Sequence, residues 1–367
     1  MTTKFYRSHV AYALGILSHP LPFSAISADA SRVAIVYFAL VSLDVCGFSD
    51  ALTVGRRETL VSWLYSCFAR GDGGGGFCGG PVTSGTGASR AWSVPMTYAA
   101  IASLIMLGDD CSRIDRTALT SALSSLQQPD GSIDSSPLAR GDGDVRFIYA
   151  AAATVTLLDL PLRGLDACGA LRFIRACQSY EGGFALQPGG EAHGGATYCA
   201  IAARRLLSDW FLSKSVGRSE EEDTRDVHAT MRWLVRRQDT VSGGFTGRAG
   251  KEADSCYSFW IGGASAILLL DLLLVLPEIS ETSASAQDLP FFNACALRSW
   301  VATCTGAGCG VGFAREPEED SDPFHTAYAL AGLALAREPT LRAVDAVLGL
   351  TVETSRLWAE KKNFASM

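Results

Sequence analysis

Glycine-rich turns recur along this chain at intervals of roughly 50 to 70 residues. Each turn follows a helical segment with polar residues and precedes a more apolar helical segment, whereas strand-like alternation is rare. Pairs of polar outer and apolar inner helices stack because each apolar face needs a neighbour to cover it. The turns are GGGGFCGG near Phe77, PDGSIDS near Gly131, EGGFALQ near Phe184, SGGFTGR near Phe245 and GVGFARE near Phe313.

The repeat predicts an all-α fold, in which such helix pairs can stack as an open solenoid or close into a ring. We favour the closed α/α toroid, in which six helix hairpins form an α–α barrel. The inner helices are apolar almost all round, as expected of a ring covered by an outer ring. We expect one domain over residues 1–367, with the glycine turns gathered at one end of a central cavity. Residues 213–226 and 278–288 are predicted to be solvated surface insertions. Gly71–Gly87 lacks the ending of a P-loop, which favours a flexible loop.

Composition restricts the partners and the compartment of the protein. The formal net charge of −7 argues against a nucleic-acid partner. Eleven cysteines show no disulfide-like spacing, and no clean signal-peptide core precedes them, so we expect a cytoplasmic protein. The longest apolar run, Ile261–Pro277, contains Asp271 and is shorter than the roughly 20 residues that span a bilayer. No transmembrane segment is therefore expected.

The segment Gly243–Trp260 combines several reactive groups within a short distance along the chain. Arg248 and Lys251 lie in a loop, and Asp254 and Cys256 follow at the start of an apolar helix. A carboxylate and a thiolate two residues apart can bind zinc when a third ligand, normally an imidazole, is added. The alternative is a helix-capping aspartate beside a core cysteine, because aspartate is also a good N-cap.

The third ligand is predicted from the repeat. His325 begins the inner helix of the last repeat, the place that Cys256 occupies in the repeat before it, and neighbouring helix N-termini lie close together. Asp254, Cys256 and His325 would leave a fourth position for a substrate thiolate. The alternative for His325 is a surface or capping histidine.

A cluster of hydrogen-bond donors is expected beside this metal site. His193, one repeat earlier, would join Arg248, Lys251 and Tyr257 near helix N-termini, which carry partial positive charge. Such a cluster suits a diphosphate that gains negative charge as it leaves. An aromatic lining is predicted for the cavity, although aromatic stripes are more often plain core. Its members are Phe38, Tyr98, Tyr149, Tyr198, Phe259 and Trp260.

Together these motifs resemble the β subunit of the protein prenyltransferases. The motifs are GRxxKxxDxCYSFW at Gly247–Trp260, EAHGG at Glu191–Gly195 and the histidine of the last repeat, and the resemblance extends over essentially the whole chain. It implies an α/α barrel, one Zn²⁺ held by Asp254, Cys256 and His325, and a separate α subunit. It also implies diphosphate contacts from His193, Arg248, Lys251 and Tyr257. The implied lipid and peptide cavity contains Ala34, Phe38, Tyr98, Arg146, Tyr149, Cys199 and Trp260.

Within that family the chain resembles type I geranylgeranyltransferase most. Ala34 stands where farnesyltransferase has a tryptophan that shortens the lipid pocket, so a geranylgeranyl chain would fit. Arg315 stands where farnesyltransferase has a magnesium-binding aspartate and the type I enzyme a lysine, which implies that Mg²⁺ is not required. Ser93 replaces the usual histidine near the C-terminal end of the peptide. The implied reaction transfers geranylgeranyl from its diphosphate to the cysteine of C-terminal CaaX proteins such as small GTPases.

Other functions stay open at this point. A farnesyltransferase or a Rab-type geranylgeranyltransferase β subunit would share most of these residues. A terpene cyclase on a similar barrel would need a DxDD-like proton donor, which the sequence lacks. A zinc-stabilised helical scaffold would not need the cationic residues next to the metal site.

Overall fold

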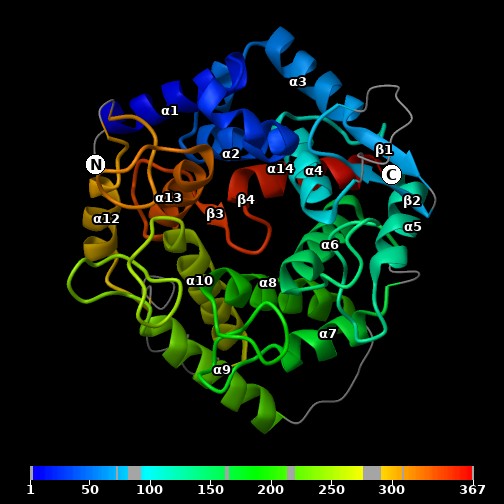
Figure 1. Cartoon of the computed structure of the whole chain (residues 1–367), viewed down its shortest axis with the longest axis vertical. Helices are drawn as coiled ribbons and strands as arrows, with labels where there is room; N and C mark the ends of the chain where they lie inside the picture. Colours follow the sequence, from blue (N-terminus) through cyan, green and yellow to red (C-terminus); the bar gives the residue numbers. More distant parts are fainter. Residues whose placement is uncertain are drawn as a thin grey trace.

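The structure is a computed structural model that describes residues 3–71, 73–81, 92–161, 165–212, 220–275, 291–307 and 310–365. Within these ranges the regular structure is mainly helical and alternates between two concentric rings (Figure 1). The inner helices are α2 (Arg32–Val45), α4 (Val94–Met106), α6 (Val145–Leu158), α8 (Gly194–Leu212), α10 (Tyr257–Val275) and α13 (Pro323–Leu335). The outer helices are α1 (Thr3–Ser18), α3 (Val54–Ser66), α5 (Arg116–Leu126), α7 (Ala167–Ala176), α9 (Glu220–Val235) and α12 (Ala294–Thr303).

The inner ring is closed. Each inner helix contacts the next one along the chain, and α13 returns to contact α2. Burial follows the predicted division, because 12 of the 14 residues of α6 are buried but only Leu60 and Leu64 of α3 are. The α/α toroid predicted from the sequence is confirmed.

Three of the glycine turns fasten their outer helix to the inner helix that follows it. The backbone N–H of the turn's aromatic residue donates a hydrogen bond to a threonine hydroxyl in the first turns of the inner helix. Because this bond recurs, the inner helices begin at a common level at the same end of the ring. The pairs are Phe77–Thr97 (3.0 Å), Phe184–Thr197 (2.9 Å) and Phe313–Thr326 (2.9 Å).

The turns also need glycine because they touch the outer helix of the next repeat. A Cβ on Gly131 would lie 2.1 Å from the carbonyl oxygen of Gly169 in α7, and one on Gly182 would lie 2.3 Å from that of Ala229 in α9. Both glycines also have positive φ, +95° and +103°, a conformation that side chains disfavour. The repeated glycines therefore set the spacing between neighbouring helix pairs.

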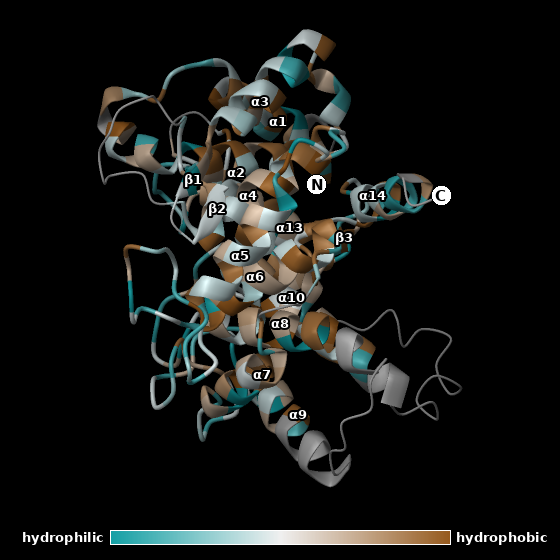
Figure 2. Cartoon of the chain, turned by 90° about the vertical axis from the view of Figure 1, so that its right-hand side faces the viewer, coloured by the Kyte–Doolittle hydropathy of each residue, from teal (hydrophilic) through white to brown (hydrophobic). Residues whose placement is uncertain are grey.

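The opposite end of the ring carries the C-terminal part of the chain. A short antiparallel hairpin of β3 (Val344–Asp345) and β4 (Leu350–Thr351) leads into α14 (Val352–Ala365). Figure 1 shows the hairpin inside the inner ring, and Figure 2 shows α14 on the side away from the glycine-turn loops. The two ends of the toroid are therefore built from different parts of the sequence.

Two loop expectations were wrong in part. Residues 220–226 belong to α9 rather than to a loop, since acidic residues are favoured in the first turn of a helix. Residues 213–219 and 278–288 lie outside the described residues. The Gly71–Gly87 segment contains β2 (Gly74–Phe77), paired with β1 (Phe68–Gly71), where a Cβ on Gly75 would meet the Ala69 carbonyl at 2.8 Å. Residues 72 and 82–87 lie outside the described residues.

One described stretch, Ala25–Val45, is long and apolar enough to cross a membrane by length and composition, and half of its apolar window is buried. The stretch consists of most of η1 (Phe23–Ser31) and all of α2. In α2, 11 of 14 residues are buried within the closed ring. A core helix passes this test as readily as a membrane span does, so the stretch is explained by its place in the inner ring.

His9 of α1 is fully buried against the last glycine turn. Its ring stacks on Phe313 with centroids 4.4 Å apart and meets the edge of Phe5 at 4.6 Å. Among the described residues neither ring nitrogen has a hydrogen-bond partner, and burial lowers the pKa of His9 to about 4. The packing therefore requires the neutral imidazole.

We expect this histidine to make the fold acid-sensitive. Because the pKa of His9 is about 4 when folded and about 6.5 when unfolded, its contribution is intact above pH 6.5 and is lost as the pH falls toward 4. At pH 5 the loss is about 2 kcal/mol. His9→Phe should flatten the dependence of unfolding free energy on pH, measured by urea denaturation at pH 7 and pH 5. The exposed His19, replaced by Gln, is the control, and an unchanged slope in His9→Phe would contradict the expectation.

Candidate functional site

Three potential metal ligands meet where α10 and α13 begin. Asp254 and Cys256 immediately precede α10, and His325 is the third residue of α13. One ligand atom from each lies within 4.8 Å of the other two, and Asp254 Oδ1 is 3.4 Å from His325 Nε2. Asp254 Oδ1 also accepts the Cys256 N–H at 2.9 Å, so the aspartate does cap this turn. Capping and metal binding are therefore compatible in this geometry.

The repeat brings these residues together in a register that differs from the expected one. Before four of the inner helices, one residue donates its N–H to the carbonyl of the turn's aromatic residue. By this bond Asp254 corresponds to Asp322 and to His193, so His325 corresponds to Tyr257 rather than to Cys256. The equivalence assumed from the sequence was wrong by one residue, but neighbouring helix starts still converge. The bonds are Ser93–Phe77 (3.1 Å), His193–Phe184 (2.9 Å), Asp254–Phe245 (3.0 Å) and Asp322–Phe313 (3.2 Å).

Asp322 belongs to the site and was missed from the sequence. Its carboxylate caps α13 by accepting the His325 N–H at 2.9 Å, and its other oxygen is 2.5 Å from His325 Nδ1. Burial disfavours the charged imidazole, but hydrogen bonds with Asp254 and Asp322 outweigh it and raise the pKa of His325 to about 9. The signal was present as an aspartate three residues before the histidine in DSDPFH. Asp322 leaves Nε2 of His325 directed at Asp254.

The donor set suits a zinc ion. A thiolate, an imidazole and a carboxylate are typical ligands of Zn²⁺, and a carboxylate on the far nitrogen of a ligating histidine is the usual outer partner. Burial, followed by the charge of Asp254, raises the pKa of the Cys256 thiol. A bound cation reverses this electrostatic balance, because it stabilises the thiolate and the neutral imidazole. Asp254, Cys256 and His325 are the residues that would hold a metal ion, and Asp322 would orient the imidazole.

His193 and Tyr257 form the next part of the site. Nδ1 of His193 accepts the Gly195 N–H at 3.1 Å, so the neutral ring carries its proton on Nε2 and donates it to the Tyr257 hydroxyl at 2.9 Å. The tyrosine proton is then free to point at a ligand. A Cβ on Gly247 would lie 2.1 Å from Cζ of Tyr257, so this glycine is required for the ring's position.

Cationic side chains surround this pair. Arg248 forms an ion pair with Glu191 at 2.9 Å, and Arg146, at the start of α6, is held by Asp144 at 2.6 Å. Burial, and then the charges of Arg248 and Arg146, lower the pKa of His193, so these cations lie within electrostatic reach of the imidazole. Lys251 is exposed in the same loop as Arg248.

Arg315 connects the cationic group to the metal-ligand group. Its Nε lies 3.8 Å from Asp254 Oδ2, and its backbone carbonyl accepts the Ser255 N–H at 2.8 Å. The last glycine turn therefore places a fixed positive charge next to the three ligands. Ser93, where a histidine was expected, caps α4 by accepting the Met96 N–H at 3.4 Å.

The predicted cavity residues differ in how far they are buried. Ala34, Phe38 and Trp260 are half-buried although they belong to the inner helices. Two aromatic residues of α13, missed in the sequence, pack with them: Phe324 lies 5.4 Å from Phe38 and Tyr328 lies 4.3 Å from Trp260, measured between ring centroids. Tyr98, Tyr149 and Cys199 are buried, as are Tyr198 and Phe259, whereas Arg146 is exposed.

The fold and its site define the class of protein. The sequence matches the family described as the prenyltransferase alpha-alpha toroid domain over residues 5–350, and the chain belongs to that family. The solved structure of Candida albicans protein geranylgeranyltransferase-I complexed with GGPP superposes with a TM-score of 0.79 at 22% identity. That superposition covers 97% of this chain and 98% of the other, which supports the same fold.

Two relatives identify the subunit. Protein farnesyltransferase subunit beta of Schizosaccharomyces pombe is 33% identical over 331 residues, 89% of this chain and 77% of that protein. Geranylgeranyl transferase type-1 subunit beta of Arabidopsis thaliana is 31% identical over 357 residues, 93% of this chain and 88% of that protein. The chain is therefore a protein prenyltransferase β subunit. The two identities are too similar to distinguish the lipid.

Proposed function

We propose that this chain is the β subunit of a type I protein geranylgeranyltransferase that contains one zinc ion. The observation that carries the proposal is the convergence of Asp254, Cys256 and His325 within 4.8 Å, with Arg315 beside them. A metal-binding thiolate, imidazole and carboxylate next to fixed cations suit a reaction between a thiol and a diphosphate ester. A scaffold that only bound structural zinc would have no need for those cations.

The mechanism follows from the positions of these side chains. Asp254, Cys256 and His325 would hold the ion, and Asp322 would fix the orientation of the imidazole. When bound, zinc lowers the pKa of a substrate thiol so that the thiolate prevails at neutral pH. The peptide sulfur forms a bond to C1 of geranylgeranyl diphosphate as the C1–O bond breaks, and the electron pair leaves with the diphosphate.

The chain's own donors stabilise this leaving group. The proton of the Tyr257 hydroxyl is available because His193 donates to its oxygen. Arg248, Lys251 and Arg315 supply positive charge that needs no rearrangement during the reaction. Arg146, held by Asp144, would position the peptide. Because Arg315 is a permanent cation, we infer that Mg²⁺ is not needed to neutralise the diphosphate.

The preference for a C20 chain rests on the small residue Ala34. It is half-buried one helical turn before Phe38, where a larger side chain would take up space inside the ring. The alternative, a farnesyltransferase β subunit, is favoured by the 33% identity to the Schizosaccharomyces pombe protein. The proposed partners are a helical α subunit and CaaX-terminated protein substrates. We place the complex in the cytoplasm and treat residues 1–367 of this chain as one domain.

The choice of lipid is directly measurable. With a protein prenyltransferase α subunit co-expressed, we expect transfer of C20 to a CaaX-Leu peptide at least about tenfold more efficiently than C15, since pocket size discriminates by roughly this factor per small group. The measurement is kcat/KM for each diphosphate. Preference for C15 would favour the farnesyl alternative, and turnover of neither lipid would contradict the proposed activity.

Zinc content tests the ligand assignment. We expect about one zinc per heterodimer, lost in Asp254→Asn and His325→Ala, and an affinity about 10- to 100-fold weaker in Asp322→Ala, because outer partners of ligating histidines have effects of that size. Metal analysis after dialysis against a chelator measures this. Cys295→Ser removes an exposed thiol and serves as the control. Full zinc retention and normal turnover in Asp254→Asn would refute the assignment.

Arg315→Asp tests the role of the fixed cation. The exchange should lower turnover without Mg²⁺ by about a hundredfold, since a lost charge-stabilising group costs this much. Millimolar Mg²⁺ should restore part of the activity, because the new carboxylate can bind the cation. Arg172→Asp on the outer helix α7 is the control. Unchanged turnover and no response to Mg²⁺ would show that Arg315 does not face the diphosphate.

A further inference from the structure

Four tyrosines on successive inner helices bind the tip of the C-terminal hairpin, residues 346–349. The tyrosines are Tyr37, Tyr98, Tyr149 and Tyr198, one each from α2, α4, α6 and α8, and all are buried. Three of them donate hydroxyl hydrogen bonds to consecutive carbonyl oxygens of the tip. The bonds are Tyr198 to Ala346 (2.8 Å), Tyr149 to Val347 (3.1 Å) and Tyr98 to Leu348 (2.7 Å).

The hydroxyl oxygens also lie close to one another, but each group has one proton: Tyr37 can donate to Tyr98, whereas Tyr149 and Tyr198 use theirs on the tip. Tyr37 and Tyr98 lie 3.2 Å apart, and Tyr149 and Tyr198 lie 3.1 Å apart, between oxygen atoms. Gly349 fits beneath them, since a Cβ there would lie 3.0 Å from the Tyr98 hydroxyl, and its φ is +67°. The tip is thus bound by a layer of hydroxyl groups inside the ring.

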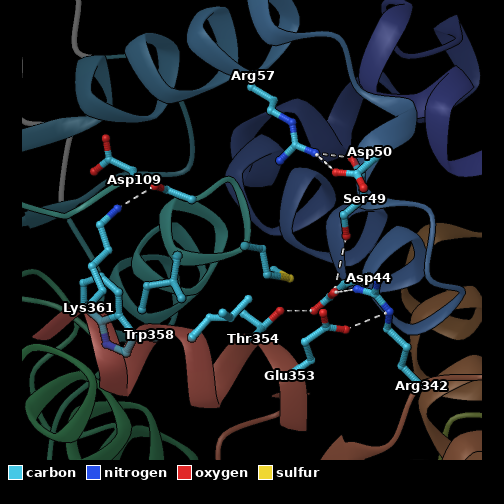
Figure 3. A pocket seen from close by; sticks show the side chains of 14 residues that line it. Asp44, Ser49, Asp50, Arg57, Asp109, Arg342, Glu353, Thr354, Trp358 and Lys361 are labelled. Carbon is cyan, nitrogen blue, oxygen red and sulfur yellow. Dashed lines mark hydrogen bonds and ion pairs between the residues drawn. The ribbon is translucent and has the colours of Figure 1, made fainter.

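Both ends of the hairpin are fastened to the end of α2 through one buried carboxylate (Figure 3). Asp44 accepts a hydrogen bond from Arg342, just before β3, at 3.2 Å. It also accepts hydrogen bonds from Thr351 at the end of β4 and from Thr354 in α14, each at 2.8 Å. Arg342 also pairs with Glu353 at 3.2 Å. Because both ends are held, the height of the tip within the ring is fixed.

The tip lies below the half-buried residues of the metal end. Tyr37 follows Ala34 by three residues of α2, about 4.5 Å further from the helix start at 1.5 Å per residue. Val347 and Leu348 of the tip pack against the core but keep part of their surface exposed. An apolar chain entering from the metal end would meet Ala34 first and this tip next.

We propose that the hairpin tip is the floor of the lipid site and a determinant of the length of isoprenoid that the enzyme accepts. The inference rests on the proposed function and adds the chain's own C-terminal residues to its specificity. Val347 and Leu348 supply the apolar surface against which the last isoprene unit ends. The tyrosine hydroxyls and Asp44 act as positioning groups, because they hold the tip and do not touch the reacting atoms.

The first test labels the floor in the unaltered heterodimer. The heterodimer is incubated with a geranylgeranyl diphosphate analogue that carries a diazirine on its last isoprene unit, and the complex is irradiated. The β subunit is then digested and analysed by mass spectrometry. We expect label on the peptide that contains residues 346–349, and competition by unlabelled C20 diphosphate. Specific label confined to the inner helices, with none on the tip, would overturn the proposal.

The second test changes the floor. Val347→Ala with Leu348→Ala should raise the C25-to-C20 ratio of kcat/KM at least about tenfold, while Leu357→Ala on α14 leaves it unchanged. Tyr98→Phe with Tyr149→Phe removes two hydrogen bonds to the tip but keeps both rings, and it should also raise the C25-to-C20 ratio. This variant provides the test if the alanine variant does not fold. An unchanged C25-to-C20 ratio in a folded variant that still uses C20 overturns the proposal about the hairpin tip but not the proposed function. A wild-type enzyme that uses no isoprenoid diphosphate overturns the proposed function as well.

Discussion

The backbone contact at each glycine turn is the constraint on which the rest of the structure depends. A turn glycine lies against the next outer helix, and the adjoining aromatic N–H binds a threonine of the following inner helix. Where both contacts occur, they set the lateral spacing and the axial level of the repeat at once. The inner helices therefore begin together, and their N-termini, each with partial positive charge, gather at one end. A site for an anion and a metal follows from that arrangement.

At the end of the ring where the inner helices begin, the acidic and basic side chains form ion pairs with one another without a metal ion. Asp254 is shared between His325 and Arg315, and Asp322 holds the other nitrogen of the imidazole. The carboxylates that raise the pKa of His325 are thus the same groups that would surround a cation. A metal ion would take the place of the proton on His325 and loosen the hold of Asp254 on Arg315. Arg315 would then be available to a second anion, and the proposed metal and diphosphate sites would be coupled.

Much of this site was predictable because its residues are local in sequence. Asp254 and Cys256 are two residues apart, and the periodic repeat brings the start of the next inner helix beside them. The register was also present in the sequence, because Tyr257 and His325 each follow the phenylalanine of their glycine turn by twelve residues. The hydrogen bonds of Asp254 and Asp322 to those phenylalanines show the same match. The hairpin was not predictable. Thr351 and Asp44 are 307 positions apart, and no periodic pattern marks a contact of that range.

The order of the elements explains why the hairpin lies at the end of the chain. Its tyrosines come from α2, α4, α6 and α8, four consecutive helices of the inner ring that α10 and α13 complete. Asp44, which fastens both ends of the hairpin, is on the first inner helix, and Arg342 follows the last one. A plug encoded between two earlier repeats would have to leave the ring and return, breaking the alternation of helices. Placed after α13, it enters from the end opposite the metal site, so the chemistry and the depth of the ring are controlled separately.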